Sequence, residues 1–174
     1  ARSYCLGGLG GWGSYLKSPL LAPLELTIGA VERVSADGDV VTILDEDKLR
    51  ADLNTLHSKG EVEALTICLI NAYINPAHER RVAEIAREIF SDTPISVSSD
   101  VVPEMQEYER TETTVVNSYV RPEVSRYVSN LQGALGERLG SQSQLSILRS
   151  DGGLASARAA AKSPVNLLMS GPAG

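Results

Sequence analysis

Apolar residues recur at steps of three and four through the second half of the chain. Between Glu104 and Leu131 this spacing predicts a long helix with one apolar stripe, made of Val115, Val116, Tyr119, Val120, Val124, Tyr127, Val128 and Leu131. Pro122 disfavours helical geometry at Arg121. We therefore expect two helical segments that meet at a kink, with the second ending near Leu139, and we expect the rest of the chain to be organised around them.

The segment before this helix alternates between strand and helix signals. Two apolar stretches within 24–44 flank the turn pair Asp37-Gly38, which predicts a β-hairpin. A helix then begins at the acidic residues 45–47 and turns the leucines of 49–56 inward. The continuous apolar run at 64–70, a helix over 76–90 and a strand near 95–99 form a predicted βαβ crossover with parallel strands.

The two ends of the chain carry weaker signals. Residues 1–23 are rich in Gly and Pro, which is typical of a linker or remnant. After the long helix we expect a strand at 145–148, a tight turn at 151–153 and a helix over 155–161. The stretch VNLLM at 165–169 is compatible with a last strand, which would lead to SGPAG at the end.

Composition and charge exclude several classes of partner. The formal net charge is −6 and no basic run occurs, which argues against a nucleic-acid surface. The apolar runs are too short to cross a bilayer, and the first residues lack a signal-peptide pattern, so we expect a cytoplasmic protein with no membrane partner. Cys5 and Cys68 are far apart and no Cys-x-x-Cys pair occurs, so no metal site is predicted and Cys68 is interpreted as a small core residue.

Candidate chemistry gathers beyond the carboxyl ends of the two parallel strands, where α/β proteins commonly bind ligands. The polar residues expected at this rim are Asn71, Tyr73, Asn75, His78, Glu79, Ser98, Ser99, Glu109, Arg110 and Thr113. Each also has a structural interpretation, such as a helix cap at Asn75 or a solvated first turn at His78 and Glu79. Arg110 either pairs with a neighbouring Glu or presents its planar fork to an anionic group.

Two Gly-containing segments near the end of the chain are further candidates for substrate or phosphate binding. Small residues allow backbone N–H groups to approach an anion. These candidates are Asp151, Gly152, Gly153, Ser170, Gly171 and Gly174. No catalytic residue is assigned from the sequence.

Four blocks of the sequence resemble the hydantoinase A/5-oxoprolinase family, which includes subunits of ATP-dependent acetone and acetophenone carboxylases. The blocks are INAYINPAHERRVAEIAREI, SSDVVPEMQEYERTETTVVNSYVRP, LRSDGGLASARAA and SGPAG, and the resemblance extends over about 24–174. It implies an α/β fold, with mixed-sheet layers that form part of an actin/sugar-kinase-like ATPase. Residues 24–107 would then end the first lobe, and residues 108–174 would supply the connecting helix and the start of the second.

The resemblance also implies an activity. Family members use ATP with Mg²⁺ to activate an amide or ketone oxygen, by phosphorylation, before hydrolysis or carboxylation. Their two Asp-bearing phosphate loops do not occur in this chain, which also carries Asp151 where the family usually has Asn. The implied function is a part of an ATP-dependent hydrolase of cyclic amides, completed by the rest of the enzyme or by other subunits. The alternatives are a subunit of a ketone carboxylase and a non-catalytic assembly module.

We expect the 174-residue chain by itself to neither bind nor hydrolyse ATP, because the phosphate loops that the resemblance implies do not occur in it. Calorimetric titration of the chain with Mg-ATP checks this expectation. Binding in the micromolar range would contradict it and would place a complete nucleotide site within these residues.

Overall fold

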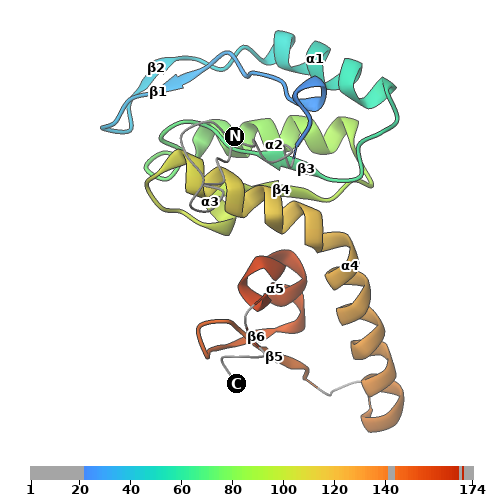
Figure 1. Cartoon of the computed structure of the whole chain (residues 1–174). Coiled ribbons are helices and arrows are strands. Elements are labelled where there is room, and N and C mark those ends of the chain that lie inside the picture. Colours follow the sequence, from blue (N-terminus) through green and yellow to red (C-terminus); the bar gives the residue numbers. More distant parts are fainter. Residues whose placement is uncertain (1–21, 141–143, 169, 171–174) are drawn as a thin grey trace, which may run out of the picture.

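A computed structural model describes residues 22–140, 144–168 and 170, so most of the Gly/Pro-rich segment 1–23 lies outside the described residues (Figure 1). The described part is a mixed α/β structure. In chain order its elements are η1 (Leu24–Leu26), β1 (Arg33–Val34), β2 (Val40–Thr42), α1 (Glu46–Ser58), β3 (Leu65–Ile67), α2 (Ala77–Ile89), β4 (Ile95–Val97), α3 (Ser98–Val101), α4 (Glu107–Leu139), β5 (Ser146–Leu148), β6 (Leu154–Ser156), α5 (Ala157–Lys162) and η2 (Pro164–Leu167).

The predicted βαβ crossover is confirmed. Strands β3 and β4 pair in parallel, with Leu65 opposite Ile95 and Ile67 opposite Val97, and α2 connects them. The inner faces of α1 and α2 pack together against these strands, and their core is aliphatic apart from Phe90. Fully burying one such side chain stabilises the fold by roughly 1.5–3 kcal/mol. The Asp45 side chain accepts a hydrogen bond from the Lys48 N–H at 3.0 Å, which explains why α1 begins there.

The predicted hairpin at 24–44 is present as the antiparallel pair β1–β2, which contains an irregularity between Arg33 and Val34. Its turn places Gly38 at φ +91°, in the left-handed region that favours glycine. A Cβ atom at this position would lie 2.9 Å from Cγ2 of Ile74. The turn therefore requires a glycine for its backbone conformation and for its close approach to the loop after β3.

Helix α4 is one helix that continues through Pro122, rather than the two predicted segments, and it ends at Leu139 as predicted. Figure 1 shows that it changes direction partway along its length. Its buried face differs from the prediction. Tyr119 is 82% exposed and Tyr127 is 66% exposed, whereas Val128 is the one fully buried member of the predicted apolar stripe among the described residues. The residues of α4 that are buried alongside it are polar: Arg110, Thr114, Asn117 and Ser118.

The predicted apolar packing of α4 is present only in part: its valines and Leu131 are buried or half-buried, but the surface that α4 covers also offers polar partners. Asn117 Nδ2 donates to Ser96 Oγ of β4 at 3.1 Å, and Asn117 Oδ1 accepts from the Val165 N–H at 3.2 Å. The hydroxyls of Ser118 and Thr66 of β3 lie 2.6 Å apart. Helix α4 therefore uses hydrogen bonds as well as apolar contacts to pack on the sheet and on η2.

The chain after α4 forms a small hairpin and two short helices beside the second part of α4 (Figure 1). The strand predicted at 145–148 is present as β5, which pairs antiparallel with β6. The first residues of the predicted helix over 155–161 belong to β6 instead, and α5 begins at Ala157. The last strand suggested by VNLLM is wrong: the segment begins with the 3₁₀ helix η2, whose first residue is Pro164. Proline suits the first turn of a helix, where its missing N–H is not needed.

The division of the chain into 1–23, 24–107 and 108–174 stays a prediction. Within the described residues, no helix combines the length and the apolar character needed to span a bilayer.

Candidate functional site

The candidate site lies at the carboxyl ends of β3 and β4, where the loop after β3, helix α3 and the start of α4 come together (Figure 1). Three polar side chains, Glu79 of α2, Ser98 of α3 and Arg110 of α4, meet there, and each is completely inaccessible to solvent. We call them the Glu79–Ser98–Arg110 network. Their positions in three different helices mean that the network joins segments that are far apart in the sequence.

Glu79 is the acceptor of the network. Its Oε1 atom accepts hydrogen bonds from the Leu69 N–H at 2.8 Å and from the Ser98 hydroxyl at 2.6 Å. Its Oε2 atom accepts from the Ser99 N–H at 2.9 Å. A buried carboxylate is costly unless several donors satisfy it. These three donors hold the start of the loop after β3 and the start of α3 against α2.

Arg110 is the donor of the network. Its Nε atom donates to Ser98 Oγ at 3.0 Å, so the same hydroxyl accepts from Arg110 and donates to Glu79. Its Nη1 and Nη2 atoms donate to the carbonyls of Glu104 and Leu69 at 3.0 and 2.7 Å. The guanidinium also lies over the ring of Tyr73, 5.6 Å from its centroid, which is a cation–π distance.

These contacts place Arg110 in the interior of the molecule. In the described part of the chain it forms no ion pair with an acidic side chain at the start of α4, which was one of its two predicted roles. Contact with an anionic ligand, the other role, stays a prediction. The guanidinium N–H groups of Arg110 are already bonded within the protein, and these bonds join α4 to both strand ends.

The remaining residues of the predicted rim surround this network, but several have structural contacts. Asn71, at φ +58°, donates to the Val34 carbonyl at 2.9 Å, and Asn75 donates to the Gly38 carbonyl at 2.8 Å, so both attach the β1–β2 hairpin to the loop after β3. Asn75 Oδ1 also accepts from the Ala77 N–H at 3.1 Å, in agreement with its predicted capping role. His78 is not solvated as expected, because its Nδ1 atom lies 2.7 Å from Glu32 Oε2.

The outer face of the rim is formed by residues with freer side chains. Glu109 is exposed and Thr113 is partly buried at the start of α4. Ser99 differs from both, because its Oγ atom is buried and has no hydrogen-bond partner among the described residues. A buried hydroxyl without a partner is uncommon in folded proteins.

The Gly-containing candidates lie elsewhere. Asp151, Gly152 and Gly153 form the exposed turn between β5 and β6, which Figure 1 shows well separated from α3. There Asp151 Oδ1 accepts from the Gly153 N–H at 3.0 Å, and Asp151 pairs with Arg149 at 2.8 Å. Ser170 is partly buried, and Gly171 and Gly174 lie outside the described residues. The structure thus does not bring the Asp151 turn to the rim.

Sequence reasoning missed the polar partners of α4. Besides Asn117 and Ser118, the Thr111 hydroxyl lies 2.9 Å from Cys68 Sγ, so Cys68 is a partly buried polar contact rather than the predicted core residue. The signal was available, because Arg110, Thr114, Asn117 and Arg121 follow each other at helical spacing. They form a polar stripe as regular as the apolar one.

The sequence matches two family models. Residues 14–90 match the hydantoinase/oxoprolinase N-terminal region, and residues 110–174 match the hydantoinase/oxoprolinase model. Caprolactamase subunit alpha of Pseudomonas jessenii is 33% identical over 160 residues, which are 92% of this chain and 23% of that subunit.

Two solved structures resemble the fold. Nucleotide-free acetone carboxylase has a TM-score of 0.82 and 31% identity, over 91% of this chain and 22% of its own. ATP-dependent caprolactamase from Pseudomonas jessenii has a TM-score of 0.79 and 31% identity, over 97% of this chain and 24% of its own. These likenesses confirm the predicted fold class, an α/β part of an ATPase fold. The chain spans less than a quarter of the length of each of these proteins.

We predict that Arg110→Lys lowers the free energy of unfolding by about 1–3 kcal/mol, because a lysine cannot reach Ser98, Glu104 and Leu69 together and leaves buried acceptors unpaired. Urea denaturation measures the effect. The matched control is Arg126→Lys on the same helix, where an exposed ion pair with Glu123 should be nearly neutral. Unchanged stability combined with a sharp loss of turnover in the complete enzyme would instead assign Arg110 to ligand binding.

Proposed function

The chain belongs to the hydantoinase/oxoprolinase family, and we propose that it forms part of an ATP-dependent amidohydrolase that opens a cyclic amide of the hydantoin or 5-oxoproline type. In this reaction ATP transfers its γ-phosphoryl group to the carbonyl oxygen of the ring amide and becomes ADP. Water then attacks the activated carbon, the C–N bond of the ring breaks, and inorganic phosphate is released along with the ring-opened acid. The observation that supports this proposal most strongly is the likeness to an ATP-dependent caprolactamase, which extends over 97% of the chain.

The contribution that we assign to this chain is to shape one wall of the substrate cleft. The Glu79–Ser98–Arg110 network fixes the loop after β3 and helix α3 at the strand ends, so that the residues around them keep a constant geometry. Positioning of this kind lowers the barrier of a reaction because less freedom is lost on reaching the transition state.

The described residues do not fit a site for Mg-ATP. No group of three or more His, Cys, Asp or Glu side chains able to hold a metal ion occurs among them. Both carboxylate oxygens of Glu79 already accept hydrogen bonds from the protein. We therefore assign ATP and Mg²⁺ to other parts of the complete enzyme or to other subunits, and the relative from Pseudomonas jessenii is itself a subunit.

A second candidate function is ATP-dependent carboxylation of a ketone such as acetone or acetophenone. The likeness to acetone carboxylase, with a TM-score of 0.82, favours it. The same activation of an oxygen would then precede the addition of a carboxyl group rather than hydrolysis. A non-catalytic assembly module is the third hypothesis, in which this fold only binds partner chains.

The complete enzyme, purified with any subunits that it carries, distinguishes these functions. We expect Mg-ATP with 5-oxoproline, hydantoin or caprolactam to give ADP together with the ring-opened acid, and we expect neither product when the cyclic amide is omitted. ADP release that depends on a ketone and bicarbonate would select the carboxylase instead. No ADP release with either substrate class would contradict both reactions and leave the assembly module.

A further inference from the structure

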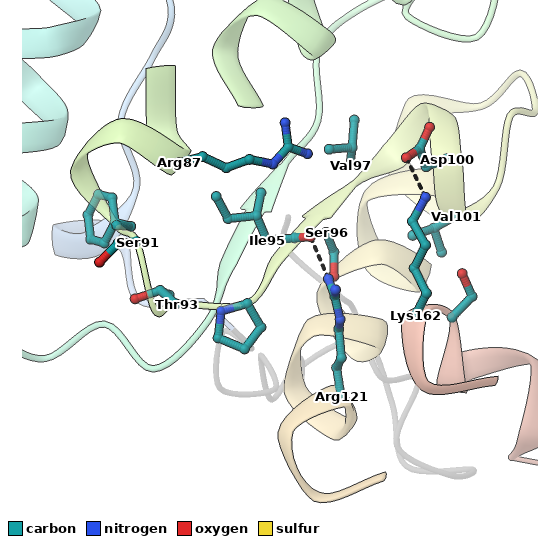
Figure 2. Close-up of a pocket in the computed structure, with 13 residues that line it drawn as sticks. Arg87, Ser91, Thr93, Ile95, Ser96, Val97, Asp100, Val101, Arg121 and Lys162 are labelled. Carbon is teal, nitrogen blue, oxygen red and sulfur yellow. Dashed lines mark hydrogen bonds and ion pairs between the residues drawn. The ribbon is translucent and has the colours of Figure 1, made fainter. Parts of the chain in front are cut away.

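A cavity of about 260 Å³ lies beside β4, and none of the three residues of the Glu79–Ser98–Arg110 network lines it. Within the described residues β4 pairs only with β3, and the cavity extends along the segment from Thr93 to Val101. The end of α2, the middle of α4 and the end of α5 supply its other walls. Figure 2 shows Arg87 and Arg121 reaching it from opposite sides, while Lys162 approaches from α5.

The lining of this cavity is cationic. Three positively charged side chains, Arg87, Arg121 and Lys162, face a single carboxylate, that of Asp100. Asp100 pairs with Lys162 at 2.9 Å (Figure 2), so it neutralises that charge and not the arginines. Among the described residues neither Arg87 nor Arg121 forms an ion pair. Two guanidinium charges therefore share this cavity without a counter-ion from the described protein.

The position of Arg121 holds one of these charges in the partly buried wall of the cavity. Its Nη1 atom donates to the Ile95 carbonyl of β4, which fixes the side chain along the strand. Burial, and secondly the charge of Arg87, lower the pKa of Arg121 from its ordinary value. Burial and the charge of Arg87 both disfavour the charged form of Arg121, and a bound anion would favour that form.

The size and the polar groups of the cavity limit what it holds. Its volume lies below the roughly 300–1,000 Å³ of sites for drug-sized ligands, which favours a small molecule. The side chains of Ser91, Thr93 and Ser163 add hydroxyl groups to the lining. The planar guanidinium of an arginine can donate two parallel hydrogen bonds to the oxygens of one phosphate or carboxylate group.

We propose that this cavity binds a small dianion, a phosphate or a short dicarboxylate, through Arg87 and Arg121. The site is distinct from the substrate wall at the strand ends, and it does not depend on which reaction the complete enzyme performs. Because its walls come from α2, β4, α4 and α5, a bound dianion would join the βαβ unit to the segment after α4.

The test is calorimetric titration of the complete protein at low ionic strength, with inorganic phosphate and succinate as separate probes. The protein is first saturated with ADP, so that the probes do not bind at the nucleotide site. We expect at least one probe to bind, and Arg87→Gln to weaken its binding by roughly tenfold or more, the loss of one charge-assisted contact. Arg121→Lys keeps the charge but loses the fork, and should weaken binding as well. Arg126→Gln, on the same helix but outside the cavity, should leave the affinity unchanged within about twofold.

The melting temperature of each variant separates binding from folding. Arg87 is exposed, so Arg87→Gln should melt within a few degrees of the unchanged protein. Binding of phosphate alone would identify a phosphate site, and binding of succinate would extend it to dicarboxylates. No binding of either probe, or equal affinities in the unchanged protein and in folded Arg87→Gln, would overturn the proposal.

Discussion

Two buried charges constrain the part of the fold that precedes the bend in α4. Removing a carboxylate and a guanidinium from water costs several kcal/mol for each, and only a nearly complete set of hydrogen bonds offsets that cost. Glu79 and Arg110 obtain this set from Leu69, Ser98, Ser99 and the Glu104 carbonyl. Because these partners lie at both strand ends, α2, α3 and α4 must meet there for either charge to be satisfied.

The same constraint explains how one long helix serves two parts of the chain. Before its bend, α4 is held on the strands by side-chain hydrogen bonds, the last of them from Arg121 to the Ile95 carbonyl. Asn117 and Ser125 extend these contacts to η2 and to the carbonyl of Ala161 in α5. The helix therefore couples the strand ends, which we propose as a substrate wall, to the segment that follows it. The cationic cavity lies at this junction, which explains why its walls come from both parts.

The sequence predicted those elements whose burial is apolar and whose ends carry local signals. Helix α1 has its leucines at helical spacing and an acidic cap. The crossover of β3, α2 and β4 contains a continuous apolar run. These signals lie within single segments, so the sequence alone is enough to predict the elements. The buried face of α4 was assigned wrongly because both of its stripes are regular. Which stripe is buried depends on Ser96 and Thr66, whose positions belong to other segments. Strand polarity predicted that Glu79, Ser98 and Arg110 lie near one another, and they do, but ligand binding at this rim stays a prediction. The internal bonding of Arg110 and the cavity of Arg87 and Arg121 depend on contacts across the fold.

We conclude that Glu79 and Arg110 are coupled through Ser98 in their contribution to stability. A double-mutant cycle in the free energy of unfolding, with Glu79→Gln, Arg110→Met and both together, measures this coupling in the 174-residue chain. Because Ser98 Oγ is bonded to both side chains, each single change leaves the other buried charge without the opposite charge beside it. We predict that the double variant loses less stability than the two single losses combined, by about 0.5–3 kcal/mol. Losses that add within about 0.3–0.5 kcal/mol would contradict it, since the two residues would then be independent.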